Sequence, residues 1–275
     1  MKIIVITGPT AVGKTNISIK LAKQLNAEII NADSMQIYKE LNIGVAKIQE
    51  SEMDNIKHHM LNIKSIKDNY SVFDYQKDAR IILENNIKNN KNTIIVGGTG
   101  LYIKALLYNY EFEENKNDSQ FLELSNKEIY DKINNVIALD INNRRRLVRT
   151  LNKLNSNHSF VNKENELLYK NVIFIGINMD RDKLYENINK RVDIMFENNL
   201  LEEFENFKNI NSRILKTAIG YKELYLDLSL EEKKELIKKN TRNYAKRQLT
   251  WFKNKMDLKW FDNYDNVLNY IKEFK

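Results

Sequence analysis

The fold is decided by a stretch near the amino terminus, Gly8-Pro9-Thr10-Ala11-Val12-Gly13-Lys14-Thr15. The β-branched run Lys2–Thr7 precedes it and predicts a buried strand, and the pattern over Lys14–Gln24 predicts a helix. The stretch fits G-x-x-x-x-G-K-[S/T], and a strand before it with a helix after it is the context that supports such a match. We therefore expect this loop to bind a pyrophosphate group through its backbone N–H groups and the positive end of the helix.

Two side chains of this phosphate loop add chemistry to it. Lys14 brings a positive charge to the phosphates, and the hydroxyl of Thr15 is a ligand for Mg²⁺, which we expect to be the cofactor. The pattern is typical of nucleotide-binding and ATP-binding proteins. However, it recognises a pyrophosphate group and not the group attached to it, so the ligand must be identified from the rest of the chain.

Further β-branched runs and helical patterns predict an α/β fold. The predicted strands are Lys2–Thr7, Glu28–Asp33, Thr93–Gly97 and Val172–Asn178, and helical patterns alternate with them. This order is typical of a P-loop NTPase-like core, a parallel sheet flanked by helices. Residues 110–169 are polar and poor in strand patterns, so we expect a small helical insertion there. The core then comprises residues 1–109 and 170–275, the second part ending in a basic helix.

Composition excludes several classes of protein. The 275 residues include no cysteine, which excludes a disulfide scaffold, a Cys-ligated zinc site, an iron–sulfur cluster and a thiol nucleophile. The 44 Lys and Arg against 37 Asp and Glu give a net charge of +7, which indicates a polyanionic partner or merely a bias in codon usage. No apolar run is long enough to span a membrane and no targeting segment is visible, so we expect a cytoplasmic protein. Nothing in the sequence requires a partner subunit, so we also expect a monomer.

Polar residues at the ends of two predicted strands are candidates for the chemistry. Asp33 ends the second predicted strand, where the carboxyl ends of parallel strands face a ligand crevice, and it can act as a general base or assist Mg²⁺ binding. Its alternative role is that of an aspartate that only shapes a turn. Thr99, in the stretch Val96–Tyr102, can offer a hydroxyl to the same crevice, or simply belong to a glycine-rich turn before a helix.

Two basic stretches are candidates for binding RNA. Lys238 to Lys255 holds seven basic residues and no acid, with Arg242 and Lys246 on one face of the predicted helix, so it predicts a stripe that follows a nucleic-acid backbone. Arg144–Arg149 in the insertion is a second such stretch. The alternative for either is a helix face that is merely solvated.

Several stretches together resemble one family. GPTAVGKT, INADSMQIYKELNIGVAK, HHMLNI followed by YSVFDY, VGGTGLYIKALLY, RRRLVRTL, AIGYKEL and TRNYAKRQLTWFKN are similar, in order, to the tRNA dimethylallyltransferases, also called tRNA isopentenyltransferases. They span roughly residues 3 to 254. The resemblance implies transfer of a dimethylallyl group from dimethylallyl diphosphate to N6 of adenosine 37 in the tRNA anticodon stem-loop, with release of pyrophosphate.

The resemblance also implies roles for individual residues. Lys14, Thr15 and Arg191 would stabilise the leaving pyrophosphate, Asp33 would take the proton of the N6 amine, and Thr99 would help to hold that amine. The adenine must leave its stack to react. The family's base-surrounding stretch is matched by Asp33, Ser34, Met35 and Gln36, with Thr99 beside it, and its second tRNA-contacting stretch by Arg145, Arg146, Leu147, Val148 and Arg149.

Two other classes of function remain open on the sequence. A P-loop nucleotide or small-molecule kinase would share the fold, Lys14, Thr15 and Asp33, and arginines of the insertion could then belong to a lid over ATP. A non-catalytic RNA-binding protein would share the basic stripe. Prenyl transfer to tRNA, ATP turnover without it, or RNA binding that survives loss of Asp33 would distinguish the three.

Overall fold

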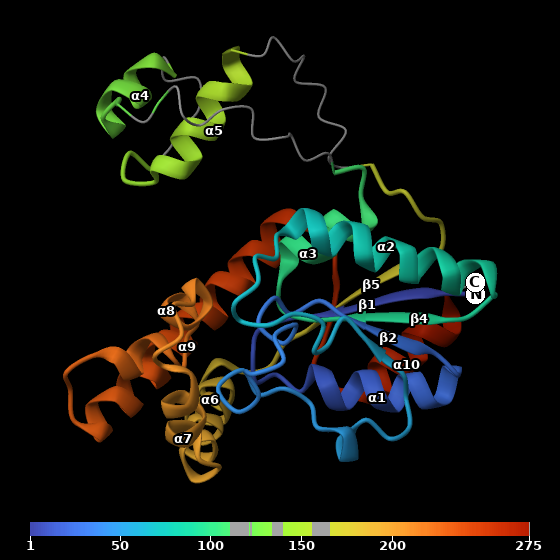
Figure 1. Cartoon of the computed structure of the whole chain (residues 1–275). Helices are drawn as coiled ribbons and strands as arrows, with labels where there is room; N and C mark the ends of the chain where they lie inside the picture. Colours follow the sequence, from blue (N-terminus) through green and yellow to red (C-terminus); the bar gives the residue numbers. More distant parts are fainter. Residues whose placement is uncertain (111–120, 122, 134–139, 156–165, 275) are drawn as a thin grey trace. The chain divides into compact units, whose positions relative to one another are not determined.

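The chain forms two compact units. The computed structural model describes residues 1–110, 121, 123–133, 140–155 and 166–274. Met1–Tyr108 and Leu167–Lys275 make up the first unit, here called the core unit, and Asn109–Glu166 make up the second (Figure 1). The insertion predicted over 110–169 overlaps the second unit.

The core unit is built on a six-stranded sheet in which every pair of neighbours is parallel, in the order β3-β2-β4-β1-β5-β6. The predicted α/β fold with a parallel sheet is confirmed. Two strands were not predicted, because β3 and β6 span only two and three residues and are too short to show a pattern. The strands are β1 (Ile3–Thr7), β2 (Glu28–Asn31), β3 (His58–His59), β4 (Thr93–Val96), β5 (Val172–Ile177) and β6 (Lys259–Phe261).

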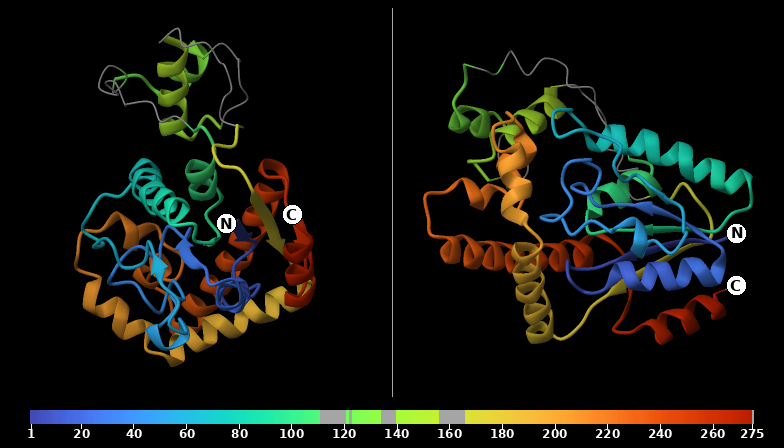
Figure 2. Two further views of the ribbon diagram at one scale, coloured as in Figure 1. Left: turned by 90° about the vertical axis from the view of Figure 1, so that its right-hand side faces the viewer. Right: turned by 60° about the horizontal axis from the view of Figure 1, so that its bottom comes forward.

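Helices cover both faces of this sheet, with α2 and α3 on one face and α1 and α10 on the other (Figures 1 and 2). No helix in the described ranges is long and apolar enough to cross a membrane. The helices of the core unit are α1 (Lys14–Leu25), α2 (Val72–Lys88), α3 (Gly100–Leu107), α6 (Arg181–Glu197), α7 (Leu200–Phe207), α8 (Arg213–Thr217), α9 (Leu230–Lys255) and α10 (Tyr264–Glu273), with 3₁₀ turns at Glu50–Glu52 and Lys222–Tyr225.

The alternation of side chains along the strands produces two cores. Ile4 and Ile6 of β1 point to the side of α1, α6 and α10, whereas Ile3 and Val5 point to the side of α2 and α3. All four are at most 1% exposed. A strand buried on both faces reads as a continuous apolar run, which is why β1 could be predicted from its sequence alone.

A third apolar cluster lies beside the sheet and supports the loop that follows β2. Ile37 and Leu41 of this loop pack with residues of α6, α7, α8 and α9, such as Val192, Phe204 and Ile237. All five are buried. The loop after β2 is therefore held by packing along much of its length.

The second unit has a small core of its own. Its helices are α4 (Asn126–Lys132) and α5 (Arg144–Asn155). Leu147 and Val148 of α5 are buried with Ile129 and Leu151. Arg144 fastens the chain before α4 by donating to the carbonyl oxygens of Phe121 and Leu124 at 2.7 and 2.6 Å.

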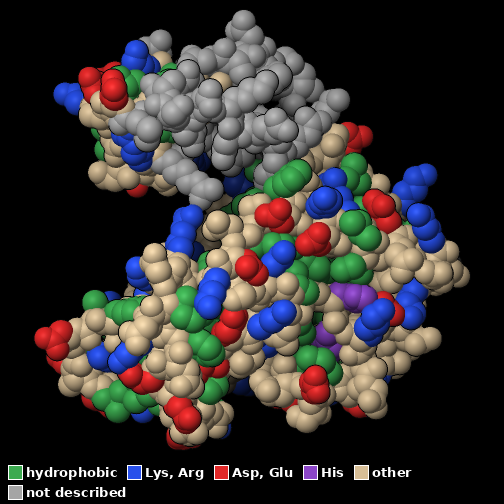
Figure 3. All heavy atoms as spheres, in the orientation of Figure 1, with side chains coloured by type: hydrophobic (Ala, Val, Ile, Leu, Met, Phe, Trp, Pro, Cys, Tyr) green, Lys and Arg blue, Asp and Glu red, His purple; other side chains and the backbone are tan. Residues whose placement is uncertain are grey.

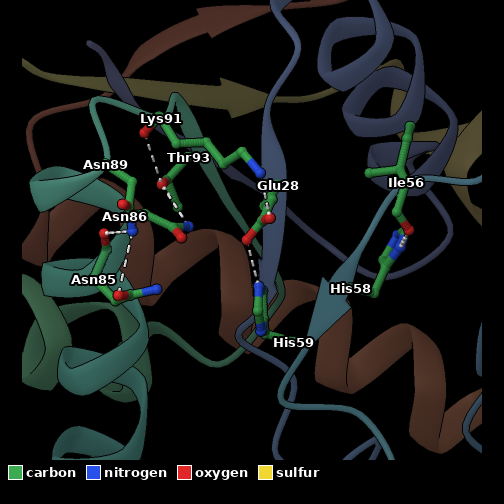
Figure 4. Close-up of polar contacts among 9 residues, drawn as sticks. All are labelled: Glu28, Ile56, His58, His59, Asn85, Asn86, Asn89, Lys91 and Thr93. Atoms are coloured by element: carbon green, nitrogen blue, oxygen red, sulfur yellow. Dashed lines mark hydrogen bonds and ion pairs between the residues drawn. The ribbon is translucent and has the colours of Figure 1, made fainter.

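An ion cluster joins three segments at the amino-terminal end of the sheet. Glu28 of β2 accepts from Lys91 Nζ at 2.6 Å and lies 2.7 Å from His59 Nε2 of β3 (Figure 4). Burial would raise the pKa of Glu28, but the bonds to Lys91 and His59 outweigh it and lower the pKa to about 2. The short strand β3 is thus fixed to β2 by a side-chain pair as well as by its backbone ladder.

Replacement of Glu28 should change how stability depends on pH. Because the folded-state pKa lies below that of the unfolded chain, Glu28 stabilises the fold above about pH 4.5 and loses this effect as pH falls toward 2. Urea unfolding should show that the stability gap between wild type and Glu28→Gln shrinks by roughly 2 kcal/mol between pH 6 and pH 3. Glu186→Gln, at an exposed site on α6, is the control, and a gap that does not change with pH would exclude this role.

Candidate active site

The phosphate loop connects β1 to α1 through a turn that requires glycine. Gly8 has φ +142°, and a Cβ there would lie 2.2 Å from the carbonyl oxygen of Ile177 in β5. Lys14 opens α1, and its Nζ donates to the carbonyl oxygens of Gly8 and Pro9 at 3.1 and 2.7 Å. The ammonium group therefore lies across the loop, in the position to meet a bound phosphate.

Lys14 lies in an environment that disfavours its charge. Burial lowers its pKa to about 7, the positive charge of Arg191 adds to the lowering, and the carboxylate of Asp33 opposes it. An anionic ligand would restore the charge, because it would add a second negative partner to the carboxylate of Asp33.

Asp33 lies just beyond the end of β2, beside this lysine. Burial raises its pKa, although the backbone N–H of Met35, which donates to Asp33 Oδ1 at 2.9 Å, opposes the shift. The charges of Lys14 and Arg191 oppose it as well. Asp33 thus shapes its turn, as the simpler alternative requires, and its carboxylate still faces the phosphate loop.

Thr99 ties the turn after β4 to the turn after β2. Its hydroxyl accepts from the backbone N–H of Ser34 at 3.0 Å and donates to Ser34 Oγ at 3.3 Å. Its own N–H donates to the carbonyl oxygen of Ala32 at 3.1 Å. Thr99 therefore lies at the predicted crevice and fixes the segment that carries Asp33.

Gln248 of α9 bridges two of these turns. Its Oε1 accepts from the backbone N–H of Thr10 at 2.9 Å, and its Nε2 donates to the carbonyl oxygen of Gly98 at 3.0 Å. The side chain is 5% exposed, and a Cβ at position 98 would lie 2.2 Å from that Nε2. A side chain at 98 would therefore displace the amide of Gln248, through which α9 is attached to the phosphate loop.

A cavity of about 330 Å³ opens beside these groups. Its polar end has Thr10, Asp33 and Arg191, whose Nη1 donates to Thr10 Oγ1 at 3.3 Å. The polar residues in the remaining wall are Tyr244, Thr241 and Arg247 of α9 together with Ser34, Thr217 and Lys222. The apolar and small residues of the wall are Met35, Gly44, Val45, Ala46, Val192, Met195, Ala218, Ile219, Gly220 and Ile237.

Buried polar groups hold the wall formed by Gly44, Val45 and Ala46. Gln36 Nε2 donates to the carbonyl oxygens of Val45 and Ala46 at 3.3 and 3.2 Å. Glu203 of α7, 8% exposed, accepts from the backbone N–H of Gly44 at 3.2 Å and from the hydroxyl of Tyr221 at 2.5 Å. Gln36 thus acts on the wall and does not line the cavity.

The remaining predicted residues lie elsewhere. Arg242 and Lys246 are on α9, and Arg242 Nη1 donates to Asn189 Oδ1 of α6 at 2.6 Å. Arg145 to Arg149 belong to α5 of the second unit, where Arg146 is exposed. Leu147 and Val148 pack into the core of that unit, so their side chains stabilise the helix. The side chains of Arg145 and Arg149 lie outside the described parts of the chain.

The phosphate loop and its neighbours offer few oxygen ligands for Mg²⁺. Thr15, in the first turn of α1, is exposed at the mouth of the phosphate loop, and Asp33 lies close to Lys14. Among the described residues no group of three or more His, Asp or Glu side chains could hold a metal ion. These donors suit Mg²⁺, which commonly takes one or two protein oxygens and completes its shell with phosphate oxygens and water.

The structure brings to the site residues that were not predicted there, and one of them, Arg247, was predicted only as part of the basic stripe over Lys238–Lys255. Gln248, Tyr244 and Arg247 come from the stretch TRNYAKRQLTWFKN, and the cavity wall comes from NIGVAK and AIGYKEL. The signal was present in these stretches, which carried the resemblance to the family. The sequence alone does not show that α9 packs against the loops after β1 and β4, and this packing brings Gln248 to the site.

Comparison with known proteins assigns the chain to a family. The family model for IPP transferase matches residues 36–255, so the chain belongs to the IPP transferase family. The tRNA dimethylallyltransferase of Bacillus subtilis (strain 168) is 44% identical over 284 residues, covering 94% of this chain and 90% of that protein. The tRNA dimethylallyltransferase of Bacillus anthracis is 43% identical over 300 residues, covering 98% and 95%.

Solved structures agree with this assignment. The full-length tRNA isopentenylpyrophosphate transferase of Bacillus halodurans superposes with a TM-score of 0.76 at 36% identity, covering 99% of this chain and 95% of that one. A eukaryotic dimethylallyltransferase acting on tRNA gives a TM-score of 0.80 at 27% identity, covering 95% and 74%. The predicted membership of the tRNA dimethylallyltransferases is confirmed.

The lowered pKa of Lys14 predicts that ligand affinity depends on pH. Above about pH 7 the free protein loses the ammonium proton, which must be regained when a diphosphate binds. Calorimetry with dimethylallyl diphosphate, without tRNA, should show the affinity falling roughly tenfold for each pH unit between 7.5 and 9. Lys14→Gln should bind more weakly with a flat profile, and a wild-type profile that is equally flat would contradict the assignment.

The bridge made by Gln248 predicts a second effect on the same affinity. Gln248→Leu removes two buried hydrogen bonds and should weaken binding of dimethylallyl diphosphate by about tenfold, because the phosphate loop loses a support. Gln76→Leu is a matched control, since buried Gln76 donates to the carbonyl oxygen of Ala105 at 2.9 Å, between α2 and α3. Equal melting points and equal affinities in the two variants would remove Gln248 from the site.

Proposed function

We propose that this protein transfers a dimethylallyl group from dimethylallyl diphosphate to N6 of adenosine 37 of tRNA, releasing pyrophosphate. One observation carries the proposal: a desolvated carboxylate, Asp33, lies between a phosphate loop and an apolar cavity. A reaction that joins an amine to an apolar group and expels pyrophosphate needs a base, a cationic seat and an apolar seat side by side. Relatives named tRNA dimethylallyltransferase over nearly the full chain support the same reaction.

The residues suggest how the bonds change. The N6 amine attacks the first carbon of the dimethylallyl group, a new C–N bond forms, and the C–O bond to the diphosphate breaks. Asp33 orients the amine and takes its proton, and its raised pKa makes it a stronger base than an ordinary aspartate. Negative charge develops on the leaving oxygens, where Lys14, Arg191 and the N–H groups of the loop stabilise it.

Magnesium belongs to this proposal. Thr15, together with oxygens of the diphosphate, would hold the ion, and the carboxylate of Asp33, which acts on the charge of neighbouring Lys14, would assist. When bound, Mg²⁺ would supply positive charge against the leaving group.

The flipped adenine is expected at the turn after β2. Asp33, Ser34 and Met35 line the cavity there, and Thr99 holds Ser34 in place. Basic residues on α9 and the exposed Arg146 of α5 supply positive charge for the tRNA backbone. Predicted contacts of Arg145 and Arg149 remain expectations from the sequence.

The kinase alternative explains less of the structure. A kinase would use the phosphate loop and Asp33, but it gives no reason for apolar residues such as Met195 and Ile237 to line the same cavity as Asp33. No kinase occurs among the relatives and structures named above, whereas each is a transferase of the same kind.

The assay that tests the function uses purified protein with unmodified tRNA and dimethylallyl diphosphate, and separately with ATP. Mass spectrometry of the digested tRNA should detect N6-(dimethylallyl)adenosine at position 37 in the first reaction. ATP turnover with no modified nucleoside would overturn the proposal in favour of a kinase, and tight RNA binding without either product would favour a binding protein.

Asp33→Asn tests the base. The amide keeps the shape and the turn but cannot take a proton, so the single-turnover rate of prenyl transfer should fall about 10²-fold or more, while tRNA affinity stays within about twofold. In wild type the rate should rise with pH until Asp33 is ionised, and this limb should vanish in the variant. An active Asp33→Asn enzyme would exclude Asp33 as the base.

A further inference from the structure

The cations of α9 fall into two groups. In its first half, Lys234 and Lys238 pair with Asp193 of α6 at 2.9 and 3.0 Å, and Lys238 also pairs with Glu235 at 2.8 Å. These charges are neutralised within the protein. Lys238, the first residue of the predicted stripe over Lys238–Lys255, is therefore already paired with carboxylates inside the protein.

In the second half of α9, Arg242 and Lys246 lie with Arg181 of α6 around one aromatic ring. The guanidinium carbons of Arg181 and Arg242 lie 5.2 and 6.0 Å from the ring centre of Tyr185, which is on α6. Burial would raise the pKa of Tyr185, but the positive groups of Arg181 and Lys246 outweigh it and lower the pKa. Three cations from two helices thus lie around a single side chain.

This cluster has no internal counter-charge. Among the described residues, no carboxylate forms an ion pair with Arg181, Arg242 or Lys246. Like charges held this close repel one another, and the ring faces offset only part of the repulsion. Elsewhere the charges are mixed: over the face of the core unit in Figure 3, Lys and Arg alternate with Asp and Glu.

The cluster also lies on the helix that reaches the phosphate loop. α6 begins shortly after β5 ends, on the edge of the sheet where the loop lies. Asn187, two residues beyond Tyr185, donates to the carbonyl oxygen of Ala11 at 3.4 Å, and Arg191 donates to Thr10. An anion bound at the cluster would thus contact α6, the helix that also contacts the phosphate loop.

We propose that Arg181, Arg242 and Lys246, arranged around Tyr185, form a second phosphate seat, separate from the phosphate loop. Arginine suits such a seat, because its planar group can bind two phosphate oxygens while its face rests on an aromatic ring. The chemistry is that of a phosphate group, supplied by the tRNA backbone or by the substrate diphosphate. The backbone of tRNA fits better, because the loop already provides the seat for a diphosphate. This inference rests on the proposed function.

The test compares two sets of substitutions that each remove three charges. The cluster set is Arg181→Gln, Arg242→Gln and Lys246→Gln, and the control set is Lys20→Gln, Lys77→Gln and Lys88→Gln, on α1 and α2. Anticodon stem-loop affinity is measured by fluorescence anisotropy across a salt series, and pyrophosphate affinity by calorimetry. Circular dichroism shows whether each variant folds, and Arg181→Gln alone is the milder substitute.

The seat predicts that the cluster set lowers the slope of log affinity against log salt by roughly two to three, and that the control set changes it by less than about half a unit. Weaker pyrophosphate binding with an unchanged RNA slope would also support a phosphate seat and would assign it to the diphosphate. Unchanged slope and unchanged pyrophosphate affinity would overturn it. Pyrophosphate and RNA binding need no turnover, so absence of prenyl transfer in wild type would instead refute the proposed function.

Discussion

The turn at Gly8 is the constraint on which the rest of the site depends. β1 and β5 are neighbours in the sheet, with Thr7 opposite Gly176, so the chain that leaves β1 must turn directly against the end of β5. There is no room for a Cβ at Gly8, and its φ of +142° is one that other residues rarely adopt. Because the turn is this tight, the loop curls back over the start of α1 and Lys14 can span it. Parallel pairing then brings the loops after β2 and β4 to the same edge, so Asp33 and Thr99 meet the phosphate loop.

The long helix α9 completes the site from outside the sheet. Through Gln248 it contacts the loops after β1 and β4, and through Tyr244 and Arg247 it closes one side of the cavity. Through Lys234 and Lys238 it is paired with α6, whose Arg191 reaches Thr10. The helix α9 therefore holds both the basic residues that would bind tRNA and the polar residue that supports the phosphate loop. The cavity therefore has Arg191, the carboxylate of Asp33 and apolar residues such as Met195 together in its lining.

What could be predicted from the sequence is what depends on near neighbours. The phosphate loop, the strand before it and the helix Leu230–Lys255 follow from local patterns, because glycine conformation and a capping serine at Ser229 act over a few residues. Contacts between distant segments left no local trace: Gln248 and Thr10 are 238 positions apart, and Glu203 and Gly44 are 159 apart. Leu147 and Val148 show the reverse case. They are buried together with Leu151, so the apolar residues within this basic stretch form the buried face of α5, which their spacing alone makes predictable.

The central claim is that a loop typical of nucleotide-binding proteins here binds the diphosphate of dimethylallyl diphosphate. This diphosphate leaves as pyrophosphate when the dimethylallyl group is transferred to tRNA. The most direct measurement is the stoichiometry of the reaction, with pyrophosphate, inorganic phosphate and modified adenosine counted in the same sample. The structure predicts one pyrophosphate released for each dimethylallyl group joined to tRNA, with no inorganic phosphate formed and no requirement for ATP. Phosphate released from ATP, with no pyrophosphate matched to a modified adenosine, would contradict it.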